Sequence, residues 1–161
     1  MIVVADTSVI INLVLVGQAD LLRVLFREVL VPPAVESEFF RLAASAGRFA
    51  GLCVPDWVKV SGPVAIPEPV GRRANLDKGE TEALALALAI HADAVLIDES
   101  TGRAAAIELG LMPIGVLGIL VRAKRHGHLA AVAPVVDELL ARANFRASPD
   151  LVLEVLQLAG E

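Results

Sequence analysis

Two short apolar runs that each end in an aspartate are the feature that most constrains the fold of this chain. Residues 2–5 are followed by Asp6 and residues 94–97 by Asp98, and neither run contains a charge. Such runs, followed by small polar residues, are typical of buried parallel strands that lead into turns. Because ligands of open α/β sheets bind beyond the carboxyl ends of the strands, the two aspartates are expected to share one site. A divalent cation would offset their mutual repulsion.

The length and apolar content of the chain bound its class. The 161 residues suit a single domain, spanning 1–161, with a sizeable core. Hydrophobic residues make up 56 % of the chain, but no apolar stretch approaches the roughly 20 residues that span a bilayer. The chain enters its first strand at once and leaves no room for a signal peptide. We therefore expect a cytoplasmic protein without a membrane segment, whose excess apolar surface serves a homodimer interface.

The charge balance and the cysteine content exclude several classes of site. The chain has 14 Lys and Arg against 19 Asp and Glu, a net charge of −5, which gives no support to a broad nucleic-acid-binding surface. A bound cation can still supply positive charge where a phosphate sits. The single cysteine, Cys53, excludes an internal disulfide and a Cys-rich zinc site, and is expected to be a small buried side chain.

Strand and helix patterns alternate along the chain. We expect strands over residues 2–5, 29–31, 94–97 and 112–114, with an edge strand over 57–60. Helices are expected over residues 8–16, 19–26, 34–46, 77–92, 101–109, 116–125, 133–143 and 150–158. Residues 61–76 contain three prolines and are expected to form an irregular connection. The alternation predicts a three-layer α/β/α sandwich with a central, mainly parallel sheet.

The two strand-end aspartates have a structural alternative. Asp6 precedes a helix and could simply cap it, because aspartate is a common N-cap residue. This alternative competes with a catalytic or metal-binding role. The position of Asp6 at the carboxyl edge of the sheet favours the functional interpretation. Asp98 is freer, because Ser100 or Thr101 can cap the helix that follows it.

Two helices each carry a pair of glutamates of which one is expected to face inward. Glu38 falls within the apolar stripe of its helix, and a carboxylate buried there needs a compensating partner. Glu36 suits the helix dipole at the first turn. On the helix over 77–92, Glu80 shares a face with buried positions and is the expected inward acid, although the dipole alone would favour both Glu80 and Glu82. Whether Glu36, Glu82 or Glu99 joins the site stays open.

Three arginines are weaker candidates. Arg72 and Arg73 lie in the irregular connection, where such a pair is usually solvated, and Arg103 follows Asp98 by five residues. If the connection overhangs the site, these side chains could contact a phosphate backbone.

The acids occur in the order Asp6, Glu38, Glu80, Asp98, within the segments 3–8, 32–38, 79–83 and 96–99. This arrangement resembles the PIN-domain ribonucleases, which include the toxins of bacterial and archaeal toxin–antitoxin pairs. The stretches 102–110 and 115–121 also look like one uncharacterised PIN branch, so the resemblance covers nearly the whole chain.

The resemblance implies a PIN-like α/β/α sandwich and a metal-dependent ribonuclease. Asp6, Glu38, Glu80 and Asp98 would hold one or two Mg²⁺ or Mn²⁺ ions, which orient a water for attack on an RNA phosphodiester. Thr7 or Ser8 would steady the metal or the phosphate. The resemblance further implies a homodimer and, for a toxin, a small antitoxin partner.

Two other functions compete with this one. An aspartyl phosphotransfer protein or phosphatase commonly needs a lysine near its acids. None of the three lysines, Lys59, Lys78 and Lys124, follows a predicted core strand. A non-catalytic PIN-like module would bind RNA or a protein without cutting, an interpretation that the negative net charge supports.

Overall fold

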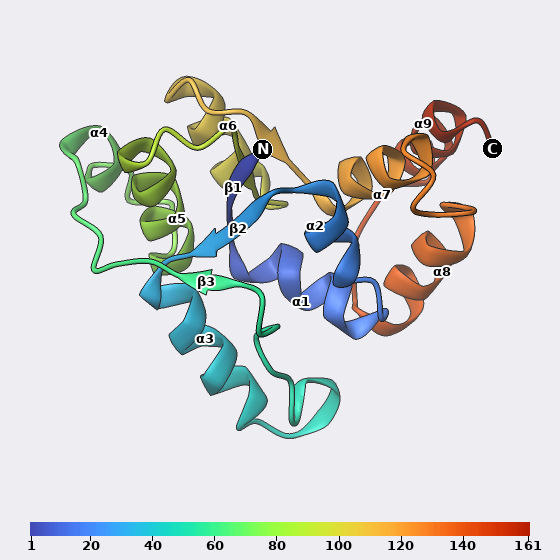
Figure 1. Cartoon of the computed structure of the whole chain (residues 1–161), viewed down its shortest axis with the longest axis horizontal. Coiled ribbons are helices and arrows are strands. Elements are labelled where there is room, and N and C mark those ends of the chain that lie inside the picture. The colour runs from blue at the N-terminus through green and yellow to red at the C-terminus, as the bar shows by residue number, and fades with distance from the viewer.

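A five-stranded, fully parallel sheet forms the centre of the computed structural model, which describes residues 1–161 (Figure 1). The strands lie in the order β3-β2-β1-β4-β5, and every neighbouring pair is parallel. Their bounds are β1 Ile2–Ala5, β2 Glu28–Val31, β3 Lys59–Val60, β4 Ala94–Leu96 and β5 Pro113–Ile114.

Helices follow almost every strand and flank the sheet (Figure 1). Their bounds are α1 Thr7–Leu15, α2 Asp20–Leu25, α3 Pro33–Ala43, α4 Glu68–Gly71, α5 Lys78–Ala89, α6 Ser100–Glu108, α7 Val116–Arg125, α8 Ala133–Arg142 and α9 Pro149–Ala159, with a single 3₁₀ turn, η1, over Gly47–Phe49. The predicted α/β fold with a parallel sheet is confirmed.

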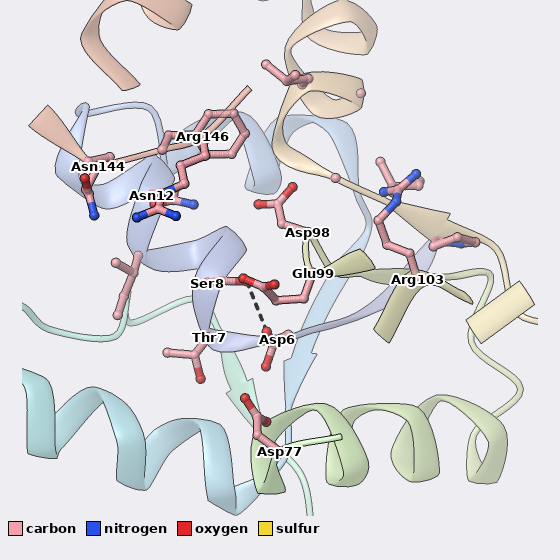
Figure 2. Close-up of a pocket in the computed structure, with 18 of the residues that line it drawn as sticks. Asp6, Thr7, Ser8, Asn12, Asp77, Asp98, Glu99, Arg103, Asn144 and Arg146 are labelled. Carbon is pink, nitrogen blue, oxygen red and sulfur yellow. Dashed lines mark hydrogen bonds between the residues drawn. The ribbon is translucent and has the colours of Figure 1, made fainter. Parts of the chain in front are cut away.

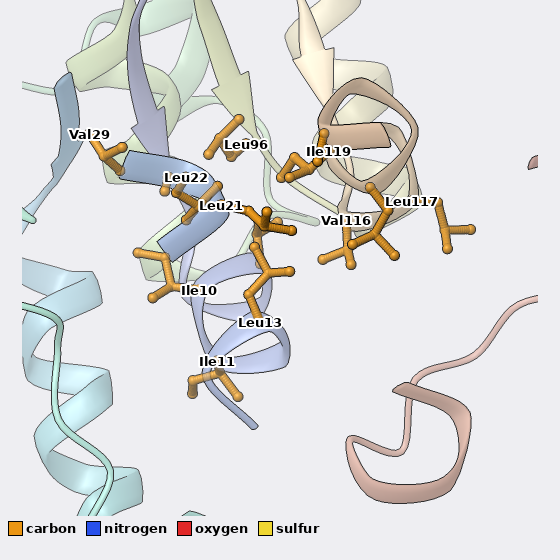
Figure 3. Close-up of a cluster of buried hydrophobic side chains, with 14 of the residues drawn as sticks. Ile10, Ile11, Leu13, Leu21, Leu22, Val29, Leu96, Val116, Leu117 and Ile119 are labelled. Atoms are coloured by element: carbon orange, nitrogen blue, oxygen red, sulfur yellow. The ribbon is translucent and has the colours of Figure 1, made fainter. Parts of the chain in front are cut away.

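Alternate side chains of β1 enter two separate apolar cores. Val3 and Ala5 pack into the larger core together with α1, α2, α3 and α7, part of which Figure 3 shows. Val4 points the other way, into a smaller core formed with α4, α5 and α6. Because a strand directs successive side chains to opposite faces, the two cores mark the two faces of the sheet. This is the three-layer arrangement that the sequence predicts.

The order of the strands brings two distant parts of the chain together. From β1 the chain moves outward to β2 and β3, and then returns past β1 to form β4 and β5. Ala5 lies in register with Leu96, and the Asp6 amide donates to the Leu96 carbonyl at 2.9 Å. The carboxyl ends of β1 and β4 are therefore neighbours where the strand order reverses, the place where open α/β sheets bind ligands.

Four local predictions are wrong. The helix expected over 34–46 ends at Ala43. The connection over 61–76 contains the short helix α4, which begins after Pro67. Helix α5 ends at Ala89 rather than at residue 92, because His91 takes a left-handed conformation (φ 51°) and the next amide bonds back to the Ala87 carbonyl. Cys53 is exposed, because it lies in the loop between η1 and β3 and not in a core.

The surface retains large apolar side chains. Phe40 is 67 % exposed, Ile107 65 % and Leu153 57 %. No helix combines the length and the apolar character that a bilayer crossing requires. The homodimer that this apolar surface suggested stays a prediction.

Candidate active site

A cleft of about 1030 Å³ opens at the carboxyl edge of the sheet, beside the ends of β1 and β4 (Figure 2). Its lining includes five acidic side chains, Asp6, Glu38, Asp77, Asp98 and Glu99. Of the four expected ligands, the structure brings Asp6, Glu38 and Asp98 to this cleft. Thr7, Ser8 and Arg103, expected to contact substrate, also line it.

Asp6 is held at the turn between β1 and α1 and is only 4 % exposed. It occupies the N-cap position of α1 without a side-chain capping hydrogen bond, and it accepts a hydrogen bond from the Ser8 hydroxyl at 3.0 Å. Burial raises the pKa of Asp6 to about 7, and repulsion from Asp77 and Glu80 adds to this, while the Thr7 amide and Ser8 oppose it. Ionised Asp6 is therefore costly at neutral pH unless a cation compensates it.

Glu38 approaches the same turn from α3. The Thr7 hydroxyl donates to Glu38 Oε2 at 2.6 Å, and Arg41 lies 3.5 Å from Oε1 on the solvent side. The hydroxyl therefore fixes one carboxylate oxygen of α3 beside the end of β1.

Gly79, in the first turn of α5, provides the space in which these acids meet. A β-carbon at Gly79 would lie 3.1 Å from Asp6 Oδ1 and 3.4 Å from both Asp77 Oδ1 and Glu38 Oε2. Carboxylate oxygens from three elements thus surround one bare α-carbon.

Glu80 is buried, as predicted, but it does not line the cleft. Its Oε2 accepts from the Asp77 amide at 3.0 Å, and Asp77 Oδ1 accepts from the Glu80 amide at 2.8 Å, which forms a capping box. Its other oxygen is buried without a partner, close to Gly102 of α6. Burial raises the pKa of Glu80, and repulsion from Asp77 adds to the shift. The capping box occupies Oε2 and leaves Oε1 without a partner, so the role of Glu80 as a metal ligand stays a prediction.

The remaining glutamates divide between structure and site. Glu82 Oε2 accepts from the Ala34 amide at 2.9 Å and so ties α5 to the first turn of α3. Glu36 lines no part of the cleft, whereas the exposed Glu99 does.

Asp98 follows β4 and reaches the first turn of α7. Its Oδ1 accepts from the Val116 amide at 2.9 Å, while its Oδ2 is buried without a partner. Gly115 permits this approach, since a β-carbon there would lie 2.6 Å from Oδ1. Burial raises the pKa of Asp98, and the Val116 amide, Arg103 and Asn12 partly offset the shift.

Arg72 and Arg73 are not brought to the cleft. Arg72 lies 3.5 Å from Glu68 in α4, and Arg73 forms an ion pair of 2.6 Å with Glu108 in α6. The α4 turn directs both side chains toward these surface acids, so the irregular connection does not overhang the site. Arg103 does line the cleft, and its guanidinium donates to the Ile97 carbonyl at 3.3 Å.

Comparison with protein families decides the relationship that the acids suggested. A family model described as PIN domain (DUF3368) matches residues 2–161. The chain belongs to the PIN-domain family. No curated protein and no solved structure matches it. The family resemblance read from the sequence is confirmed, and it supports a nuclease-like function in general terms.

Several residues of this PIN-domain cleft were missed by the sequence analysis. For Asp77 the signal is present, because Asp77-Lys78-Gly79-Glu80 has the spacing of a capping box. No local pattern marks Arg48 or Arg146, which reach the cleft from η1 and from the α8–α9 loop. Only the tertiary fold brings them to the acids.

The donor set of this PIN domain fits a hydrated divalent cation. No three acidic, histidine or cysteine side chains are close enough to form a ready-made cage. Mg²⁺ keeps several waters and is commonly held by one or two carboxylates, and the cleft offers oxygen donors only. The unpartnered Asp98 Oδ2 and Glu80 Oε1, together with the raised pKa of Asp6, indicate carboxylates whose charge the protein compensates only in part.

Proposed function

We propose that this PIN domain is a Mg²⁺- or Mn²⁺-dependent endoribonuclease. The observation that carries the proposal is the delivery of Asp6, Glu38 and Asp98 into one cleft from the end of β1, from α3 and from the end of β4. Burial raises the pKa of Asp6 and of Asp98, and a divalent cation relieves the cost of ionising them. We propose RNA rather than DNA as the substrate because of the resemblance to the PIN-domain ribonucleases.

The residues of the chain divide the work as follows. Asp6 and Asp98 would hold the cation, with Glu38 and Asp77 as further oxygen donors beside Gly79. Thr7 and Ser8 orient Glu38 and Asp6 through their hydroxyl groups. When bound, the cation supplies an activated water and neutralises charge on the phosphodiester. Glu80 fixes the N-cap geometry of Asp77 through Oε2, and its unpartnered Oε1 would be a further oxygen donor.

The test is cleavage of circular RNA by purified protein in Mn²⁺ or Mg²⁺, because only an endonuclease opens a circle. We expect cleavage that EDTA abolishes and that Asp6→Asn lowers about 100-fold or more. Asp137→Asn, which changes an exposed carboxylate of α8, is the matched control and should cleave like the wild type. Intact circles under every metal condition would contradict the proposal.

The competing functions are outcomes of the same experiment. RNA that binds without being cut would indicate the non-catalytic module, which the lack of a ready-made cage favours. Acyl-phosphate labelling of Asp6 would indicate phosphotransfer, although no lysine lines the cleft.

We further propose that the protein acts in the cytoplasm as the toxin of a toxin–antitoxin pair, with a small antitoxin as its partner. The PIN-family resemblance supports this role. Induced expression in bacteria should arrest growth, and Asp6→Asn should relieve the arrest. Equal arrest by both proteins would overturn the toxin role.

A further inference from the structure

Three arginines line the acidic cleft without an acidic partner, and one of them, Arg103, already donates to the Ile97 carbonyl. Neither Arg48 nor Arg146 forms an ion pair, although five carboxylates line the same cleft. Most other arginines near surface acids are paired, as Arg142 is with Glu138 at 2.9 Å. The cleft therefore contains guanidinium groups available to an incoming anion.

The end of α8 fixes the position of Arg146. Asn144 takes a left-handed conformation (φ 52°), and the Phe145 amide bonds back to the Leu139 carbonyl at 3.3 Å, which ends the helix. The Phe145 and Ala147 side chains pack against the larger core on either side of Arg146. Figure 2 shows Arg146 and Asn144 on the opposite side of the cleft from Asp6 and Asp77. The arginine is thus presented by an anchored turn.

Arg48 is positioned by an aromatic ring. Its guanidinium lies 4.5 Å from the centre of the Phe49 ring, and Phe49 itself packs against the larger core. The planar guanidinium can stack on an aromatic ring while the N–H groups at its edge stay free to donate hydrogen bonds.

Apolar side chains complete this side of the cleft. Phe49 and Phe145 line it together with Ile11, Leu42, Leu151 and Val155. Arginine donors match phosphate oxygens, while aromatic faces and guanidinium planes are the surfaces on which unpaired bases stack. A base pair inside a duplex offers no such face.

We propose that Arg48, Phe49, Phe145 and Arg146, here called the arginine wall, bind single-stranded RNA next to the acids. Arg146 contacts a backbone phosphate, and a neighbouring unpaired base packs against Arg48 and the apolar lining. The inference rests on the proposed ribonuclease function and assigns the residues outside the acidic cluster that hold its RNA.

The test separates binding from cleavage by measuring equilibrium binding of a labelled single-stranded RNA in EDTA over a range of salt concentrations. Arg146→Ala should weaken binding about tenfold and reduce the slope of log K against log salt by about 0.7, the value for one phosphate contact on a single strand. Arg146→Lys should recover part of that slope, because it restores the charge. Arg48→Ala should also weaken binding, and Arg142→Ala, which removes a paired arginine nearby, should leave it unchanged.

Each outcome bears on the two proposals differently. Suppose that Arg48→Ala and Arg146→Ala both cleave RNA with the KM and the binding affinity of the wild type. This result would overturn the arginine wall and would not affect the nuclease proposal. Binding that depends on Arg146 without any cleavage would uphold the wall and overturn the nuclease. Equal affinity for a duplex of the same sequence, or no RNA binding at all, would overturn the wall. Arg48 and Arg146 are exposed, so thermal unfolding should show that both variants fold normally.

Discussion

Asp6 links the chemistry of the cleft to the stability of the fold, because burial raises its pKa to about 7. An unfolded chain ionises the same group near 3.8, so between these values the folded protein binds the extra proton. The free energy of unfolding therefore has its full value, as far as Asp6 is concerned, below about pH 3.8. It falls as the pH rises through 7. Without metal, ionised Asp6 costs at most about 4 kcal/mol.

The variant Asp6→Asn should therefore be more stable than the wild type at pH 8 in EDTA, because it removes the buried charge. The difference should shrink toward pH 4, where the wild-type carboxyl is protonated. Urea unfolding at both pH values measures it. Asp137→Asn should show no such trend, and an Asp6→Asn protein less stable than the wild type at pH 8 would refute the argument.

Gly79 offers a second prediction at the scale of one residue. Gly79→Ala should hold or raise helix stability by up to about 1 kcal/mol, since alanine favours helix. Its β-carbon would nevertheless crowd the oxygens of Asp6, Glu38 and Asp77, so Mn²⁺ affinity should fall about tenfold or more. Calorimetric titration with Mn²⁺ and urea unfolding give the two values. Gly71→Ala in α4 is the control for a helical glycine that does not line the cleft.

Residue types alone identified only part of the site. Asp6 and Asp98 could be predicted because each directly follows an apolar strand, and Glu38 because it interrupts an apolar stripe. The inward position of Glu80 was also predicted, but helix periodicity cannot tell a capping carboxylate from one that faces a cleft. The capping box occupies one Glu80 oxygen and leaves the other without a partner, so the ligand role predicted for Glu80 stays a prediction.

At the scale of elements, a side-chain hydrogen bond from the Ala34 amide to Glu82 links α5 to α3. Glu82→Ala would leave the Ala34 amide without its acceptor and should lower the free energy of unfolding by about 1–3 kcal/mol. Mn²⁺ affinity should stay unchanged, because Glu82 lines no part of the cleft. Glu36→Ala, which removes a carboxylate from the first turn of α3, should cost less than about 1 kcal/mol. Loss of Mn²⁺ binding in Glu82→Ala would show instead that Glu82 belongs to the site.

The ends of elements were predicted well where a sequence signal marks them and poorly where none does. The bounds of α7 match the prediction, because an apolar stripe and a basic last turn mark both ends. The four residues of α4 offer no period to read and lie among prolines. The turn after α8 could not be predicted from the sequence either. The left-handed Asn144, which directs Arg146, lies in no recognisable motif.

For the molecule as a whole, metal binding and pH should be coupled. Mn²⁺ at 100 times its Kd should stabilise the protein by about 2.7 kcal/mol. At a fixed Mn²⁺ concentration the stabilisation should be larger at pH 8 than at pH 6, because Asp6 must lose its proton to bind the ion. Thermal unfolding with and without EDTA measures this. Asp6→Asn should lose most of the effect, and equal stabilisation of the two proteins would remove Asp6 from the site.

The exposed apolar side chains carry a prediction about assembly. With Phe40, Ile107 and Leu153 all more than half exposed, we expect the chain to form a homodimer. Sedimentation velocity at micromolar concentration measures the oligomeric state, and a purely monomeric profile would contradict the expectation. The prediction that residues 1–161 fold as one domain likewise stays open to limited proteolysis.

Because β1 and β4 are neighbours in the sheet but 88 residues apart in the chain, synthesis itself delays the site. A ribosome that has released the first strand has made Asp6 but neither Asp98 nor the turn that carries Arg146. On the proposed function, the growing polypeptide has no complete set of acids until Asp98 has emerged, so it cannot cut its own messenger during the first half of translation.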